Sequence, residues 1–197
     1  MRNTVSHTRR VAVTGVTTLF MLAVAVPAAA QTGGTATPGS TTTTTTTTPT
    51  APIGPPGRAT LRKDGNAVAP ADAPPAIQAA IAAGNAIHTY PYRWGGGHRT
   101  FYDSGYDCSG AVSYLLHAAG FLSSPLPSGP LASSWGTLGK GRWITVYANA
   151  SHAYMVVAGL RFDTSAVGEK LSQGSGPRWR ATKRKPLGYT AKFYPGY

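Results

Sequence analysis

The pattern of apolar positions first predicts a helix just after the proline pair at 74–75. Ile77, Ile81 and Ile87 recur there at roughly helical spacing among alanines, which is typical of an amphipathic helix. Pro91 ends the pattern, because a proline lacks the N–H that the next turn would need. The glycines that follow it predict a loop.

A second apolar run predicts a helix that begins at Cys108 and stops at Gly120. Asp107 stands directly before it and is a favoured residue for capping the first turn. Gly120 suits a left-handed cap at the other end, with Phe121 folding back behind it.

The second half of the domain is rich in strand-like runs. If Ala158-Gly159 forms a two-residue turn, two of these runs make a hairpin. Helices followed by consecutive strands indicate an α+β fold, with N-terminal helices packed on a small antiparallel sheet. The strand-like runs are residues 142–148, 153–158, 160–164 and the stretch "YTAKFY" near the end.

The first part of the chain differs in composition and predicts no fold of its own. Residues 1–30 have the pattern of a signal peptide: arginines, the apolar stretch Val11 to Val26, and three alanines at a cleavage site. The pair Arg9-Arg10 leaves twin-arginine export open beside the general route, and a retained membrane anchor is the alternative. We expect export and no stable membrane span after signal cleavage.

Residues 31–73 are dominated by threonine, proline and glycine, with an unbroken threonine run from Thr41 to Thr48. Such a segment has almost no large apolar side chain to bury, so it predicts a disordered linker. The folded domain is then expected at residues 74–197.

The charge balance is strongly basic, with 18 Lys and Arg against 6 Asp and Glu and a net charge of +12. This favours anionic partners, and for an exported chain cell-wall polymer or a membrane surface is more plausible than nucleic acid. Six of the positive charges lie between Arg178 and Lys192. They form either a solvated basic tail or a specific patch.

Cys108 is the single cysteine, so the chain has no internal disulfide and the thiol is buried, paired with another molecule, or reactive. At the start of a helix the unpaired N–H groups and the helix dipole favour a thiolate, which makes the sulfur a stronger nucleophile. A buried structural cysteine is the alternative reading of the same pattern.

A nucleophilic thiol needs a base, and His152 is favoured over His98 because it directly precedes an apolar strand that can hold its ring. A two-residue turn at 158–159 places Asp163 on the face of His152, within side-chain reach. A three-residue turn would bring Thr164 to that face instead. Asp163 could also be an ordinary surface carboxylate.

Three motifs together resemble the NlpC-type cell-wall peptidases, which are secreted papain-like cysteine hydrolases. They are "PYRWGGG" at 91–97, "DCSG" at 107–110 and "SHAYMVVAG" at 151–159. The resemblance implies a papain-like fold with Cys108 as nucleophile and His152 as base. It also implies that Tyr92 lies against the active site and that Asp107 and Ser109 help hold the peptide stem of peptidoglycan.

This chain departs from the family pattern at two places. A Gly-Asp pair usually opens the strand before the histidine, where this chain has Gly141-Arg142. The third polar residue usually lies twelve positions after the histidine and is commonly histidine. Thr164 holds that position here, and Asp163, one residue earlier, fits the shorter turn.

The leading hypothesis is therefore a secreted cysteine endopeptidase that cuts the bond between D-glutamate and the diamino acid of the peptidoglycan stem through a Cys108–His152–Asp163 triad. No cofactor or metal is expected, because no cluster of ligand residues has metal-binding spacing. An amidase or acyltransferase on the same thiol scaffold is the first alternative. The second is a non-catalytic wall-binding module using the basic face and the four tryptophans, Trp94, Trp135, Trp143 and Trp179.

Overall fold

The computed structural model describes residues 57–167 and 175–197. The expected signal peptide at 1–30 and most of the expected linker lie outside the described residues, so those predictions stay predictions. Within the described residues, no helix is both long enough and apolar enough to cross a membrane.

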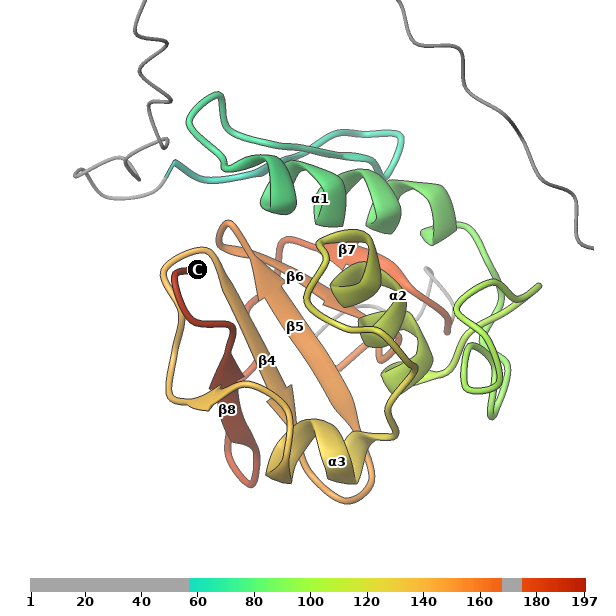
Figure 1. The fold of residues 1–197 in the computed structure, drawn as a ribbon. Coiled ribbons are helices and arrows are strands. Elements are labelled where there is room, and N and C mark those ends of the chain that lie inside the picture. The colour runs from blue at the N-terminus through green and yellow to red at the C-terminus, as the bar shows by residue number, and fades with distance from the viewer. Residues whose placement is uncertain (1–56, 168–174) are drawn as a thin grey trace, which may run out of the picture. The chain divides into compact units, whose positions relative to one another are not determined.

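An antiparallel sheet of six strands forms the centre of the domain, in the order β3-β8-β4-β5-β6-β7 (Figure 1). A separate two-stranded hairpin, β1-β2, precedes the first helix. The strands are β1 Thr60–Leu61, β2 Ala67–Val68, β3 Thr137–Leu138, β4 Ile144–Ala148, β5 Ala153–Val157, β6 Leu160–Asp163, β7 Arg178–Arg180 and β8 Thr190–Phe193.

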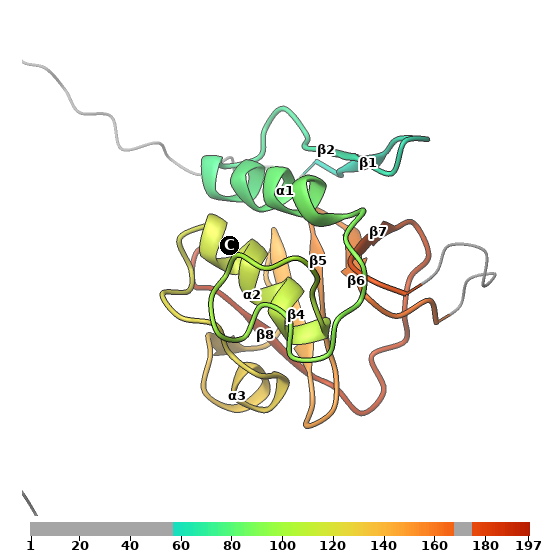
Figure 2. The same ribbon diagram turned by 90° about the vertical axis from the view of Figure 1, so that its right-hand side faces the viewer.

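Three helices pack on one face of this sheet: α1 Pro75–Ile87, α2 Cys108–Ala118 and α3 Ser128–Ser133. α2 packs against β5 and β6, α3 against β4 and β8, and α1 against α2. The chain that follows β7 runs along the opposite face (Figure 2). Helices on an antiparallel sheet confirm the predicted α+β class.

The first helix forms where the apolar spacing predicts it. Ile77, Ile81 and Ile87 are all buried in the core. Gly84 lies on the same buried side, where any larger residue would clash with the ring of Trp179 in β7. This glycine weakens the helix as an isolated segment, but it allows β7 to approach α1 closely.

The second helix also ends as predicted. Gly120 has φ of 76°, and the N–H of Phe121 donates to the carbonyl oxygen of Leu116 at 2.8 Å. The Phe121 ring folds back and is buried. These are the features of a left-handed helix cap with its accompanying hydrophobic contact.

The hairpin between β5 and β6 has the two-residue turn that the sequence predicts. Ala158 and Gly159 both have positive φ, 45° and 80°, as the favoured two-residue hairpin turns require. The register pairs Val157 with Leu160 and Met155 with Phe162. Asp163 therefore shares a face with His152, and Thr164 does not.

The folded part begins earlier than residue 74, so the predicted linker boundary is wrong at its C-terminal end. The β1-β2 hairpin packs on α1, with Ala67 and Ala73 in the core. The Asn85 side chain accepts from the Ala67 N–H at 2.8 Å and donates to the Ala67 carbonyl at 2.9 Å. The Asn85 side chain thus makes the two hydrogen bonds with the Ala67 backbone that a neighbouring third strand would otherwise make.

The basic C-terminal segment is only partly a solvated tail. Residues 178–180 form β7, Arg180 is buried in the sheet, and Lys192 is buried in β8. Positions 181–183 are exposed. Tertiary packing therefore divides a run of basic residues that looks uniform in the sequence.

α3 and β3 also form in a region whose prolines and glycines predicted only turns.

The tryptophans do not form the exposed aromatic face that a wall-binding module would need. Trp135, Trp143 and Trp179 are buried in the core, and only Trp94 is largely exposed, at 88%. The structure therefore contradicts the four-tryptophan binding face considered above.

We predict that a chain starting at residue 74 is less stable than one starting at residue 57. Removing residues 57–73 takes Ala67 and Ala73 out of the core and leaves the Asn85 amide without its two partners on Ala67. The loss should be about 2 kcal/mol, which lowers the melting temperature by roughly 5 °C. Thermal unfolding followed by circular dichroism measures it, and equal melting temperatures would contradict this role for the hairpin.

Candidate active site

Cys108 is the first residue of α2, and Asp107 caps this helix. The Asp107 carboxylate accepts from the N–H of Gly110 at 2.8 Å and from that of Gly95 at 3.1 Å. It therefore fixes the helix start and the preceding glycine loop at the same time. The thiol is partly buried at the positive end of the helix.

The small residue after Ser109 is required by packing. A side chain at Gly110 would clash with the carbonyl oxygen of Gly96, so the glycine loop could not lie against the first turn of α2. Close backbone contact of this kind explains why "DCSG" and the three glycines occur together.

His152 stands at the end of a short turn between β4 and β5. The Asn149 side chain accepts from the N–H groups of Ser151 and His152, both at 2.9 Å, and the Asn149 N–H donates to the His152 carbonyl at 3.0 Å. These bonds fix the backbone of the histidine. Sequence reasoning missed Asn149, although an asparagine four residues before a strand is a recognisable turn signal.

Asp163, at the end of β6, contacts the histidine ring. His152 Nε2 lies 3.0 Å from Asp163 Oδ1, and the N–H of Ser165 donates to the same oxygen at 2.8 Å. Thr164 is also buried, but Asp163 and not Thr164 makes the hydrogen bond to the His152 ring. Because Nε2 faces the carboxylate, Nδ1 is the ring nitrogen left for the thiol.

The pKa values of these three groups are shifted together. Burial raises the pKa of Cys108, but hydrogen bonds with the His152 ring and the Ala153 backbone, and the histidine charge, outweigh burial and lower it overall. Burial lowers the pKa of His152, but hydrogen bonds with Asp163 and Cys108 raise it to about 9. Burial raises the pKa of Asp163, but the contact with His152 and the Ser165 N–H lower it overall. These shifts favour a thiolate–imidazolium pair near neutral pH.

Arg184 is a member of this cluster that sequence reasoning missed. Its Nη1 lies 3.0 Å from Asp163 Oδ2 and 3.3 Å from His152 Nε2, and its Nη2 donates to the Tyr189 hydroxyl at 2.7 Å. The guanidinium also stacks over the rings of Tyr154 and Tyr189. No local sequence signal separates this arginine from its charged neighbours, because its position depends on how the chain returns across the sheet.

The thiol opens into a cleft of about 340 Å³. Tyr92 and Trp94 line it from the loop after α1, and Ser128 and Ser151 line it from the other side. Tyr92 lines the same cleft as Cys108, and burial, together with the charges of Cys108 and Asp107, raises the pKa of its hydroxyl. The position agrees with what the resemblance implies for Tyr92.

Asp107 and Ser109 also line the cleft, but their polar atoms are engaged within the protein. His98 Nε2 lies 2.9 Å from Asp107 Oδ1 and 3.0 Å from Ser109 Oγ, and the serine hydroxyl donates to Asp107 at 3.2 Å. His98 is therefore a partner of the helix cap and does not orient His152. Binding of substrate by Asp107 and Ser109 stays a prediction.

Comparison with known proteins gives distant structural likeness only. No protein-family model matches the chain, and no curated protein matches it. Among solved structures, it is similar to the peptidoglycan hydrolase RipB from Mycobacterium tuberculosis, with 19% identity and a TM-score of 0.46 over 62% of this chain and 66% of that one. It is also similar to Rv1477, a hypothetical invasion protein of the same organism, with 20% identity and a TM-score of 0.42 over 60% and 63%. This chain thus covers less than two thirds of either neighbour, and function has to be argued from the site.

We predict that Asp163→Asn lowers turnover by about tenfold or more and that Thr164→Val changes it much less. The carboxylate stabilises the imidazolium through the 3.0 Å contact with Nε2, whereas an amide can hold the wrong tautomer. Steady-state kinetics on a soluble stem peptide would measure both variants. A larger loss for Thr164→Val would show that the carboxylate is not the orienting group.

Asp163→Asn and Arg184→Gln should shift the pH dependence of kcat/KM in opposite directions. The active pair requires protonated His152, so activity in the wild type should fall as the pH rises through about 9. Losing the carboxylate in Asp163→Asn lowers the pKa of His152, so the fall in kcat/KM moves to lower pH. Losing the cation 3.3 Å from Nε2 in Arg184→Gln raises that pKa, so the fall moves to higher pH. A pH–rate profile of each variant tests this. Shifts in the same direction would contradict the opposing roles.

Proposed function

We propose that this chain is a secreted cysteine endopeptidase that hydrolyses the peptide stems of peptidoglycan. The observation that carries the proposal is the Cys108–His152–Asp163 constellation, in which the thiol pKa is lowered and the histidine pKa is raised, beside an open cleft. Perturbed pKa values on neighbouring groups in a cleft are typical of a catalytic site.

In the first half of the reaction, the Cys108 thiolate attacks the carbonyl carbon of the scissile amide. The resulting oxyanion faces the start of α2, where the backbone N–H of Cys108 and the helix dipole offer stabilisation. His152, protonated on the ring nitrogen that faces the thiol, gives its proton to the leaving amine. The C–N bond breaks, and the acyl group remains on sulfur.

In the second half, neutral His152 accepts a proton from water as the water attacks the thioester carbon. The C–S bond breaks, the acid is released, and the thiolate–imidazolium pair is restored. Asp163 remains ionised throughout, because its contacts with His152 and the Ser165 N–H hold its pKa below the ordinary value despite burial. Its contribution is to orient the ring and to stabilise the imidazolium.

The choice of substrate is supported by the sequence. The three motifs that resemble NlpC-type peptidases, the signal-like N-terminus and the basic charge agree with an enzyme that works on the cell wall. On this reading, the bond between D-glutamate and the diamino acid of the stem is cut. Tyr92 on the cleft wall is available to contact the stem beside the thiol.

Digestion of purified peptidoglycan, with mass spectrometry of the products, tests the proposal. The wild type should release fragments that end at D-glutamate, and Cys108→Ala should release none while keeping its fold, since only one sulfur atom is lost. The circular dichroism spectrum of the variant serves as the control for folding. Equal digestion by Cys108→Ala would rule out thiol catalysis, and products cut at the sugar–peptide amide would indicate an amidase.

A further inference from the structure

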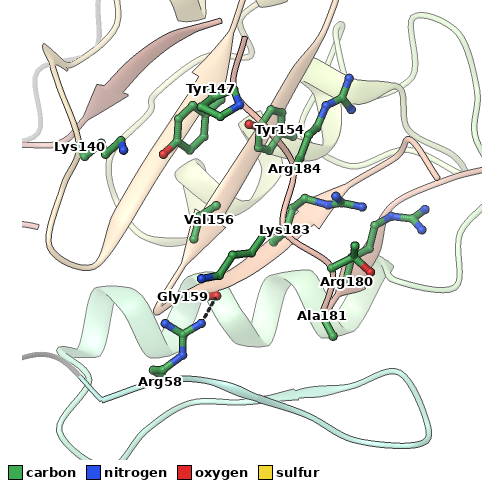
Figure 3. Close-up of a pocket in the computed structure, with 13 residues that line it drawn as sticks. Arg58, Lys140, Tyr147, Tyr154, Val156, Gly159, Arg180, Ala181, Lys183 and Arg184 are labelled. Atoms are coloured by element: carbon green, nitrogen blue, oxygen red, sulfur yellow. Dashed lines mark hydrogen bonds between the residues drawn. The ribbon is translucent and has the colours of Figure 1, made fainter. Parts of the chain in front are cut away.

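A second cavity lies on the other face of the sheet from the helices. It has a volume of about 330 Å³ and shares no lining residue with the cleft at Cys108. Its floor is formed by Tyr147 of β4 and by Tyr154 and Val156 of β5, and residues 180–184 pass along one side (Figure 3). We call this cavity the basic groove.

Cationic side chains enter the basic groove from several separate parts of the chain. Arg58 comes from the segment before β1, Lys140 from the loop before β4, and Lys183 from the segment after β7, whereas the guanidinium of Arg184, which also lines the groove, is bound to Asp163. Among the described residues, no ion pair joins Arg58, Lys140 or Lys183 to a carboxylate. Bringing like charges together costs free energy, and a bound anion would offset that cost.

A buried hydroxyl in the floor gives a second, independent observation. Tyr154 is only 1% exposed, lines the groove, and its hydroxyl has no hydrogen-bond partner among the described residues. Leaving a buried hydroxyl without a partner is costly and uncommon. Burial raises the pKa of Tyr154, so its proton stays available for donation to an anionic acceptor.

We propose that the basic groove binds a phosphate group carried on a sugar or polyol. Cations from three chain segments and a hydroxyl donor suit an anion with several acceptor oxygens, whereas a carboxylate offers only two. The stacked rings of Tyr147 and Tyr154, with centroids 5.0 Å apart, provide an apolar wall for the carbon skeleton of the ligand. A concave site of this size suits a single phosphate ester or one segment of a polymer.

This proposal goes beyond the peptidase activity and does not depend on it. The groove shares no lining residue with the cleft at Cys108, although Tyr154 and Arg184, which line the groove, also lie beside the His152 ring. Cys108→Ala should therefore bind phosphate as tightly as the wild type. A failure of catalysis and a failure of phosphate binding would be seen separately.

The test is isothermal titration calorimetry of the full chain with glycerol 3-phosphate at constant ionic strength. We expect saturable binding, with acetate giving none. Glycerophosphoglycerol, a phosphodiester, is the second probe: tighter binding of the diester points to a polymer, and tighter binding of the monoester points to a small phosphate ester. Absence of saturable binding for both phosphate probes would overturn the proposal.

Two matched double variants separate a site from a general basic field. Lys140→Gln with Lys183→Gln should weaken binding about tenfold. Lys63→Gln with Lys185→Gln removes the same charge from residues that do not line the groove and should leave affinity unchanged. Equal weakening by the two pairs would overturn the proposal, because it would show long-range attraction alone.

Tyr154→Phe tests the hydroxyl without disturbing the packing of the ring. The variant should be as stable as the wild type or more stable, because a buried hydroxyl without a partner is removed. Its affinity for glycerol 3-phosphate should fall several-fold. Unchanged affinity in this folded variant would contradict a ligand seated against Tyr154.

Discussion

The carboxylate of Asp163 is fully buried and is surrounded by positive charge. It lies 3.0 Å from His152 Nε2, 3.0 Å from Arg184 Nη1 and 3.6 Å from Arg161 Nε. A buried carboxylate is expensive unless it is paired and hydrogen-bonded, and these contacts supply both. His152 and the chain that returns across the sheet after β7 are therefore held by the same group.

The lowered pKa of the Cys108 thiol depends on two elements that are distant in the sequence. α2 presents Cys108 at the positive end of its first turn, and the β5-β6 hairpin presents His152 together with Asp163. Neither element alone accounts for the lowered pKa, because burial by itself raises the pKa of the thiol. Packing of α2 against β5 and β6 brings the two halves together, so the chemistry of the site depends on the fold remaining intact.

The sequence predicts those features that local physics decides. The helix cap at Asp107, the glycine stop at Gly120 and the two-residue turn at 158–159 each follow from a few neighbouring residues, and the turn alone identifies Asp163 over Thr164 as the partner of His152. Arg184 and the β1-β2 hairpin could not be predicted in this way. The position of Arg184 depends on its contact with Asp163, and that of the hairpin on its contact with Asn85. Such tertiary contacts leave no periodic pattern of apolar and polar residues in the sequence.

The central claim is that His152, oriented by Asp163, keeps Cys108 ionised despite burial. Titration of the thiolate by its ultraviolet absorbance, in the wild type and in His152→Ala, measures this most directly. The account predicts that the wild-type thiol ionises below its ordinary pKa and that the thiol of the variant has a higher pKa than that of the wild type. In the variant the hydrogen bond and the positive charge of His152 are lost, so burial and the negative charge of Asp107 are opposed only by the helix end and the Ala153 backbone bond. The same pKa in both proteins would contradict the account.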